Sequence, residues 1–90
     1  MEFQIPEEIL VAHLQEEAVL LHVGSKRYFR LNETGAWIWK GLEKGLDREG
    51  LVEHVRARFE IEPDAARAAI EKHVEDLHRQ QLLQPASEVD

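Results

Sequence analysis

The most constraining feature of this chain is residues 28–39, where a predicted strand runs almost without a loop into a predicted helix. Asn32 stands at the junction and is a favourable N-cap, because its side-chain oxygen can accept a hydrogen bond from a free amide of the first helical turn. Glu33 then places negative charge at the positive end of the helix. A strand tied so closely to a helix is fixed in direction and depth, so its free edge is a candidate docking site for another extended chain.

Two further strands are predicted before this segment. Residues 10–15 and 18–23 are short apolar runs separated by a pair of glutamates, which favours a hairpin. A Gly-Ser pair makes the next turn, and residues 26–31 form the third strand. Two short turns between three strands imply an antiparallel meander in sequence order, with the first and third strands at the edges.

Three helices are predicted after the strands, over residues 33–43, 48–59 and 63–81. Asp47 can cap the second helix, and Pro63 suits the first position of the third. Apolar side chains recur at helical spacing in each helix: Ile38, Trp39 and Leu42, then Leu51, Val52, Val55 and Phe59, then Ala66, Ile70, Val74 and Leu77. The segregated elements predict an α+β fold, a three-stranded antiparallel sheet followed by three helices in an arrangement that resembles a winged helix.

The length of 90 residues suits one domain. We expect a single domain over residues 1–90, with a core from about residue 9 to residue 83 and flexible tails. After Pro85 the chain is polar and is expected to fray.

Composition and charge narrow the functional classes. There is no cysteine, which excludes disulfides, thiolate zinc sites and cysteine nucleophiles. No apolar run approaches the roughly 20 residues of a membrane span, and the acidic start is unlike a signal peptide, so a cytoplasmic location is expected. The net charge of −7 argues against general affinity for nucleic acid or anionic membranes.

No pattern of catalytic or metal-ligating residues is found. The five histidines have no zinc spacing, and His73 and His78 lie five residues apart, a poor helical pair for one metal. There is no nucleophile elbow and no glycine-rich phosphate loop. We therefore expect no catalytic residues, no metal site and no cofactor, and we predict that the chain is not an enzyme.

A basic cluster and one tryptophan are the remaining candidates for binding. Lys26, Arg27 and Arg30 crowd the third strand, either as a solvated edge or as an edge suited to an acidic peptide. Trp37 falls off the apolar stripe of its helix, so it is either a partly covered rim residue or a contact for a partner.

DNA binding is the competing interpretation, because three helices with strands can form a winged helix. The third predicted helix contains Arg67, Lys72 and Arg79 but four acidic residues. Such a helix repels phosphate, so an acidic winged-helix regulator is the weaker alternative.

The sequence resembles the PqqD-like family in two places. The run YFRLNE at residues 28–33, followed by GAWIW at residues 35–39, is similar to that family's central signature. The later apolar pattern is similar to the family's tail: Leu51, Val52, Phe59, Ile70, Val74, Leu77, Leu82 and Leu83. The resemblance spans residues 10–83. Ala69, His73 and Gln81 depart from it, standing where the family often has aspartate, an aromatic residue and glycine.

The resemblance implies a non-catalytic recognition element for ribosomally made, modified peptides. Family members bind the leader of a precursor peptide as an added strand, on the edge of the third strand and against the third helix. The residues that this implies for peptide binding are Lys26, Arg27, Tyr28, Phe29, Arg30, Leu31, Arg67, Ile70, His73, Val74 and Leu77. For the last helix's apolar residues, a place in the core and a place in the wall of a groove both remain open.

The features of residues 28–39 are most similar to stand-alone proteins of lasso-peptide clusters. This implies a leader peptidase and an ATP-dependent cyclase as partner enzymes. An adaptor for a radical-SAM or other modified-peptide pathway is the alternative.

Overall fold

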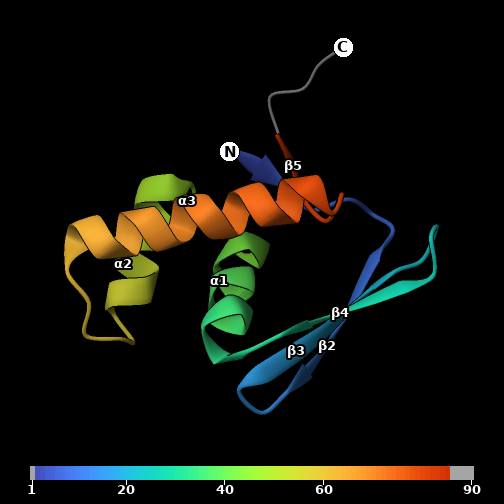
Figure 1. Ribbon diagram of the computed structural model, residues 1–90, viewed down its shortest axis with the longest axis horizontal. Coiled ribbons are helices and arrows are strands. Elements are labelled where there is room, and N and C mark those ends of the chain that lie inside the picture. Colours follow the sequence, from blue (N-terminus) through green and yellow to red (C-terminus); the bar gives the residue numbers. More distant parts are fainter. Residues whose placement is uncertain (1, 86–90) are drawn as a thin grey trace.

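Three strands between residues 9 and 31 form the predicted antiparallel meander. The computed structural model describes residues 2–85, so the expected fraying after Pro85 lies outside the described residues. Strands β2 (Ile9–Leu14), β3 (Glu17–His22) and β4 (Arg27–Leu31) form an antiparallel sheet in the order β2-β3-β4 (Figure 1). Lys26 stands outside β4, in the turn before it, where it takes a φ of 62°.

The junction of β4 and α1 (Glu33–Glu43) is built as predicted. The Asn32 side chain caps the helix, its Oδ1 accepting a hydrogen bond from Gly35 N at 2.9 Å. Gly45 ends the helical region with a φ of 84°, a left-handed conformation that glycine adopts without steric penalty. No loop residue therefore separates the end of β4 from the helix cap.

The other two helices begin where predicted and end earlier. Helix α2 (Arg48–Arg56) is capped by Asp47, whose Oδ1 accepts from Gly50 N at 2.8 Å, and α3 (Pro63–Arg79) starts at its proline. Helix α3 ends because Gln81 takes a φ of 64° and Leu82 N donates back to Leu77 O at 2.8 Å. The helices were predicted to end at about residues 59 and 81, whereas α2 ends at Arg56 and α3 at Arg79.

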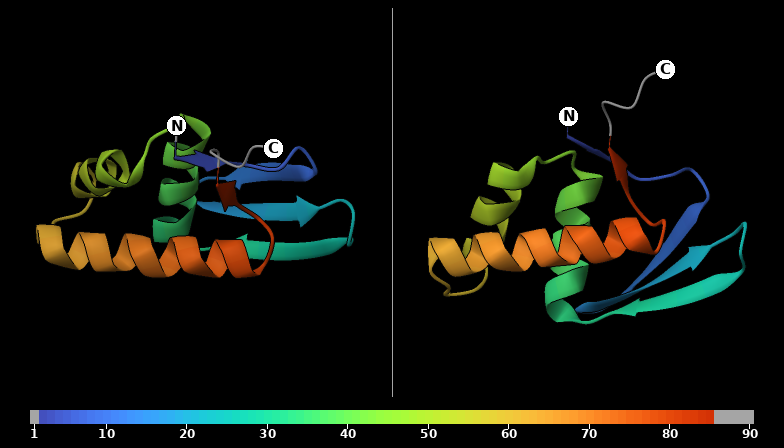
Figure 2. Two further views of the ribbon diagram at one scale, coloured as in Figure 1. Left: turned by 90° about the horizontal axis from the view of Figure 1, so that it is seen from above. Right: turned by 45° about the horizontal axis from the view of Figure 1, so that its top comes forward.

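The helices lie on one side of the sheet, and the core fills the space between them (Figure 2). Ala18 and Leu20 of β3 are fully buried there, together with the apolar stripes of α1, α2 and α3. The predicted stripe residues are buried except Phe59, which is only partly covered. No helix of residues 2–85 is both long and apolar enough to cross a membrane.

A second, two-stranded sheet was not predicted. Strand β1 (Phe3–Gln4) pairs antiparallel with β5 (Gln84–Pro85), with Phe3 opposite Pro85. The Phe3 ring is only 6% exposed and belongs to the core. The core therefore begins before the expected limit of residue 9, while its last member is Leu83, as expected.

Candidate functional site

Strand β4 is an edge strand whose second edge is unpaired within residues 2–85. In Figure 2, left, β4 and α3 run along the same side of the molecule. Arg27 of β4 links the two, since its Nη2 donates to Gln80 Oε1 at 3.3 Å. At the other end of the strand, a Cβ built on Gly35 would stand 3.1 Å from Cε1 of His73 in α3. We call the open edge of β4 and the adjacent flank of α3 the β4–α3 edge.

The flank of α3 that belongs to this edge follows from the helical period. Ala69, His73, Asp76 and Gln80 lie on one side of the buried stripe, and two of them make the contacts with β4 and α1 just described. Ala69, Asp76 and Gln80 were not among the residues predicted for this edge. Their spacing groups them, but nothing in the sequence tells which flank of the helix faces the sheet.

Arg67 lies on the opposite flank, contrary to the sequence prediction. Its Nη2 donates to Glu49 Oε1 of α2 at 3.1 Å. On the same flank, Glu71 accepts from Arg48 Nε at 2.7 Å. This flank packs against α2, so Arg67 is not brought together with β4.

The apolar residues of α3 are core residues in this structure. Ile70, Val74 and Leu77 are 1%, 2% and 4% exposed, so they lie in the core, and their contact with a peptide stays a prediction. Leu31 of β4 is buried as well. In this structure these four predicted contact residues support the β4–α3 edge from inside.

The side chains of β4 divide between the two faces of the sheet. Phe29 lies opposite the fully buried Leu20, so Arg27, Phe29 and Leu31 point toward the helices. Tyr28 and Arg30 point to the outer face, where Tyr28 is 72% exposed. The predicted basic cluster is thereby split, with Arg27 alone on the helix-facing side of the strand.

His73 contributes a buried polar atom to the β4–α3 edge. Its Nε2 is buried and has no hydrogen-bond partner within residues 2–85. Desolvation by burial lowers the pKa of His73, and the carboxylate of Asp76 opposes this in part. Burial therefore favours the neutral form of the His73 imidazole.

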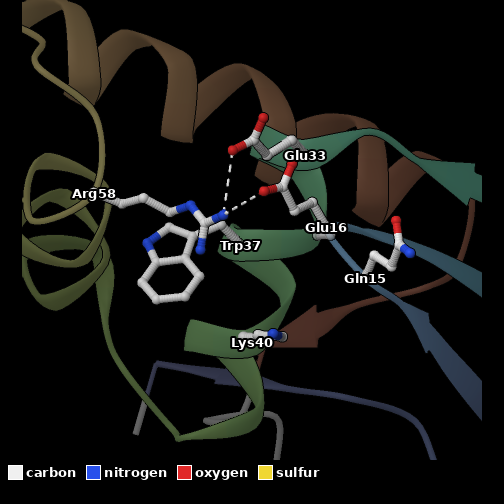
Figure 3. Close-up of a pocket in the computed structure, with 7 residues that line it drawn as sticks. Gln15, Glu16, Glu33, Trp37, Lys40 and Arg58 are labelled. Atoms are coloured by element: carbon white, nitrogen blue, oxygen red, sulfur yellow. Dashed lines mark hydrogen bonds and ion pairs between the residues drawn. The ribbon is translucent and has the colours of Figure 1, made fainter.

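Trp37 is engaged inside the domain. Its Nε1 donates to His54 O at 2.7 Å, and His54 Nε2 donates to Trp37 O at 2.9 Å. The two rings stack with centroids 4.2 Å apart. The Arg58 guanidinium lies 4.8 Å from the indole centroid and forms ion pairs with Glu33 and Glu16 at 3.2 Å and 3.7 Å (Figure 3).

These contacts join the β2–β3 turn, α1 and the segment after α2. Burial is the main cause that lowers the pKa of His54, which favours the neutral ring stacked on the indole. The structure thus accounts for Trp37 as a packing residue at a partly exposed position. Whether it also contacts a partner remains a prediction.

No group of three or more metal-ligating side chains occurs within residues 2–85. The β4–α3 edge offers an unpaired backbone edge, an arginine and a half-buried imidazole whose Nε2 atom is buried. This arrangement suits the binding of an extended chain through backbone hydrogen bonds.

Comparisons with known proteins show the family and the fold of this chain. A family described as coenzyme PQQ synthesis protein D (PqqD) matches residues 17–83. TbiB1 in complex with the TbiA(beta) leader peptide is similar with a TM-score of 0.85 and 26% identity, over 97% of this chain and 99% of that chain. A lasso peptide synthetase B1 complexed with the leader peptide gives 0.84 and 29%, over 94% and 100%. No curated protein matches. Because the family match covers well over half of its residues, this chain belongs to the PqqD family.

Proposed function

We propose that this protein binds the leader segment of a ribosomally made precursor peptide and presents it to the enzymes that mature the peptide, in a lasso-peptide pathway. The observation that carries the proposal is the open edge of β4 beside α3 in a fold that matches two leader-peptide complexes over nearly its whole length.

The leader binds as a strand added antiparallel to β4. Backbone hydrogen bonds along the edge supply affinity regardless of sequence, while side chains of alternate leader residues give selectivity. On the helix-facing side these side chains meet Arg27, Phe29 and His73. On the outer face they meet Tyr28 and Arg30.

The protein acts as an adaptor and performs no chemistry of its own. Holding the leader converts the encounter of enzyme and precursor into an intramolecular event, which raises the effective concentration of the core peptide. The partner enzymes are a leader peptidase and, after it, a cyclase. A newly made precursor is a cytoplasmic substrate, so the protein is placed in the cytoplasm.

A second candidate is an adaptor of another modified-peptide pathway, since the matching family is described after a protein of coenzyme PQQ synthesis. Both candidates share leader binding and differ in the enzyme that receives the leader. A DNA-binding role is disfavoured by the acidic side chains exposed on α3, among them Glu71 and Glu75.

Titration of the ¹⁵N-labelled protein with the leader encoded by a neighbouring precursor gene tests the binding mode. The largest amide shifts are expected in residues 26–31, with smaller ones at His73 and Gln80. Arg27→Glu should weaken binding by roughly 1–3 kcal/mol because a charge contact is reversed. Arg67→Gln is the matched control and should bind as the parent does. Shifts confined to β2 would contradict the proposal.

A second arm of the same experiment tests the adaptor role. With the leader peptidase of the same cluster, cleavage of the precursor should be fast only when this protein is present. The Arg27→Glu variant should restore less of the rate than Arg67→Gln. Equal cleavage with and without the protein, or cleavage by the protein alone, would contradict an adaptor function.

A further inference from the structure

We propose that the β4–α3 edge reads an acidic side chain in the leader, placed against Arg27 on the helix-facing side of the added strand. This inference rests on the proposed function and deepens it, because it names the chemistry of one residue of the partner.

Neighbouring side chains orient the Arg27 guanidinium, but no carboxylate within residues 2–85 neutralises its charge. Its guanidinium lies 5.1 Å from the centroid of the Phe29 ring, a cation–π contact that holds it against β4. Its hydrogen bond goes to the uncharged amide of Gln80, at 3.3 Å. The positive charge is therefore fixed at the β4–α3 edge without a carboxylate beside it.

The lack of a carboxylate partner is unusual in this molecule. The chain has 18 acidic against 11 basic residues, so most arginines find an acidic neighbour. Five arginines form ion pairs with carboxylates: Arg30, Arg48, Arg58, Arg67 and Arg79. Within residues 2–85, Arg27 and Arg56 form none, and Arg56 donates instead to the carbonyl of Ile61 at 3.1 Å. Arg27 is thus the unneutralised arginine of the β4–α3 edge.

The neighbours of Arg27 strengthen its preference for an acid. Lys26 precedes it in the turn and adds positive charge at the same end of the strand. Asp76 is the acidic residue on this flank of α3, and its Oδ1 is engaged by Arg79 Nη1 at 2.8 Å. Arg30 lies on the other face of the sheet, paired with Glu17 at 2.8 Å, and does not compete for the same leader side chain.

The register of an added antiparallel strand converts the preference for an acid at Arg27 into a sequence pattern in the leader. Leader residues two apart share one face of the strand. Because the leader runs opposite to β4, the residue facing Phe29 precedes the residue facing Arg27. The expected helix-facing pattern, read from the leader's N-terminus, is an apolar residue, any residue, then aspartate or glutamate.

Selection from an mRNA-displayed library of random 20-residue peptides tests the pattern. The parent protein should enrich peptides with an acid two residues after an apolar residue. The enrichment of the acid should disappear against Arg27→Gln and persist against Arg30→Gln, a same-strand control that removes the same charge. Circular dichroism confirms that both variants fold. Against Arg27→Glu, lysine or arginine should replace the acid.

A double-mutant cycle on one selected peptide gives the size of the effect. Changing its acid to the corresponding amide should weaken binding to the parent roughly tenfold and leave binding to Arg27→Gln nearly unchanged. Selected peptides with no fixed acid, or an acid that persists against Arg27→Gln, would overturn the inference and leave the proposed function standing. Failure to enrich any peptide would instead overturn the proposed function, and the inference with it.

Discussion

The Nε2 atom of His73 is buried at the β4–α3 edge without a hydrogen-bond partner within residues 2–85. A buried ring nitrogen without a hydrogen-bond partner destabilises the folded state, and a proton added to the ring destabilises it further. Trp39 Nε1 is the other buried side-chain atom without a partner within residues 2–85. Because burial lowers the pKa of His73, this side chain binds a proton more weakly in the folded state than in the unfolded state.

The pH dependence of stability follows from that difference. Above about pH 6.5 the ring is neutral in both states and contributes no pH dependence. As the pH falls below this value the unfolded state takes up the proton first, so the free energy of unfolding declines. Each such histidine contributes at most about 1.4 kcal/mol per pH unit.

We expect urea unfolding between about pH 7 and pH 5.5 to show a steeper loss of stability for the parent than for His73→Phe. The residual slope in the variant includes His54, whose pKa is also lowered by burial. Equal slopes for the two proteins would show that His73 is readily protonated in the folded state.

At the scale of elements, the contact between α1 and α2 depends on Gly41. A Cβ built there would lie 2.7 Å from Leu51 Cδ2 and 2.8 Å from His54 Cδ2. Neither neighbour can move easily, since Leu51 is fully buried and His54 is stacked on Trp37. The absence of a side chain therefore sets how closely the two helices approach.

Gly41→Ala should destabilise the protein by about 1–3 kcal/mol despite the higher helix propensity of alanine, because the core becomes overpacked. Gly35→Ala is the control in the same helix. It also replaces glycine by alanine, but its added Cβ would lie 3.1 Å from His73 Cε1, a less severe contact. Chemical denaturation should place Gly41→Ala below Gly35→Ala in stability. The reverse order would mean that the α1–α2 contact adjusts at little cost.

The sequence predicts the larger elements because their signals are local. Asn32, Asp47 and Pro63 mark helix starts through their own hydrogen bonding or ring geometry. The strands β1 and β5 were not predicted because each is only two residues long, too short to show an alternating apolar pattern. The buried stripe of α3 was predicted, but which flank of the helix lies beside β4 was not, since this depends on contacts such as that of Arg27 with Gln80, which join residues far apart in the chain.

For the whole molecule, β1 and β5 close the fold by pairing its two ends. Phe3 of β1 is buried in the core, with the Arg48 guanidinium 5.1 Å from its ring centroid. Arg48 also forms ion pairs with Glu2 and, at 2.7 Å, with Glu71 of α3. The first residues of the chain are thereby tied to α2 and α3.

Phe3→Ala should lower the free energy of unfolding by about 3 kcal/mol, because it empties a core position. Gln4→Ala is the control on the same strand, where the side chain is exposed, and should change stability by less than about 0.5 kcal/mol. Thermal denaturation followed by circular dichroism compares them. Similar midpoints for both variants would show that β1 adds little to the fold.

The pairing of Phe3 with Pro85 also determines how the domain can be joined to other proteins. Because the two ends of the described chain lie side by side, one loop of a host enzyme is enough to accept the whole domain. The small sheet is separate from β2-β3-β4, so such an insertion leaves the free edge of β4 available. The same proximity permits a circular permutant with joined ends and new termini at the turn between β3 and β4.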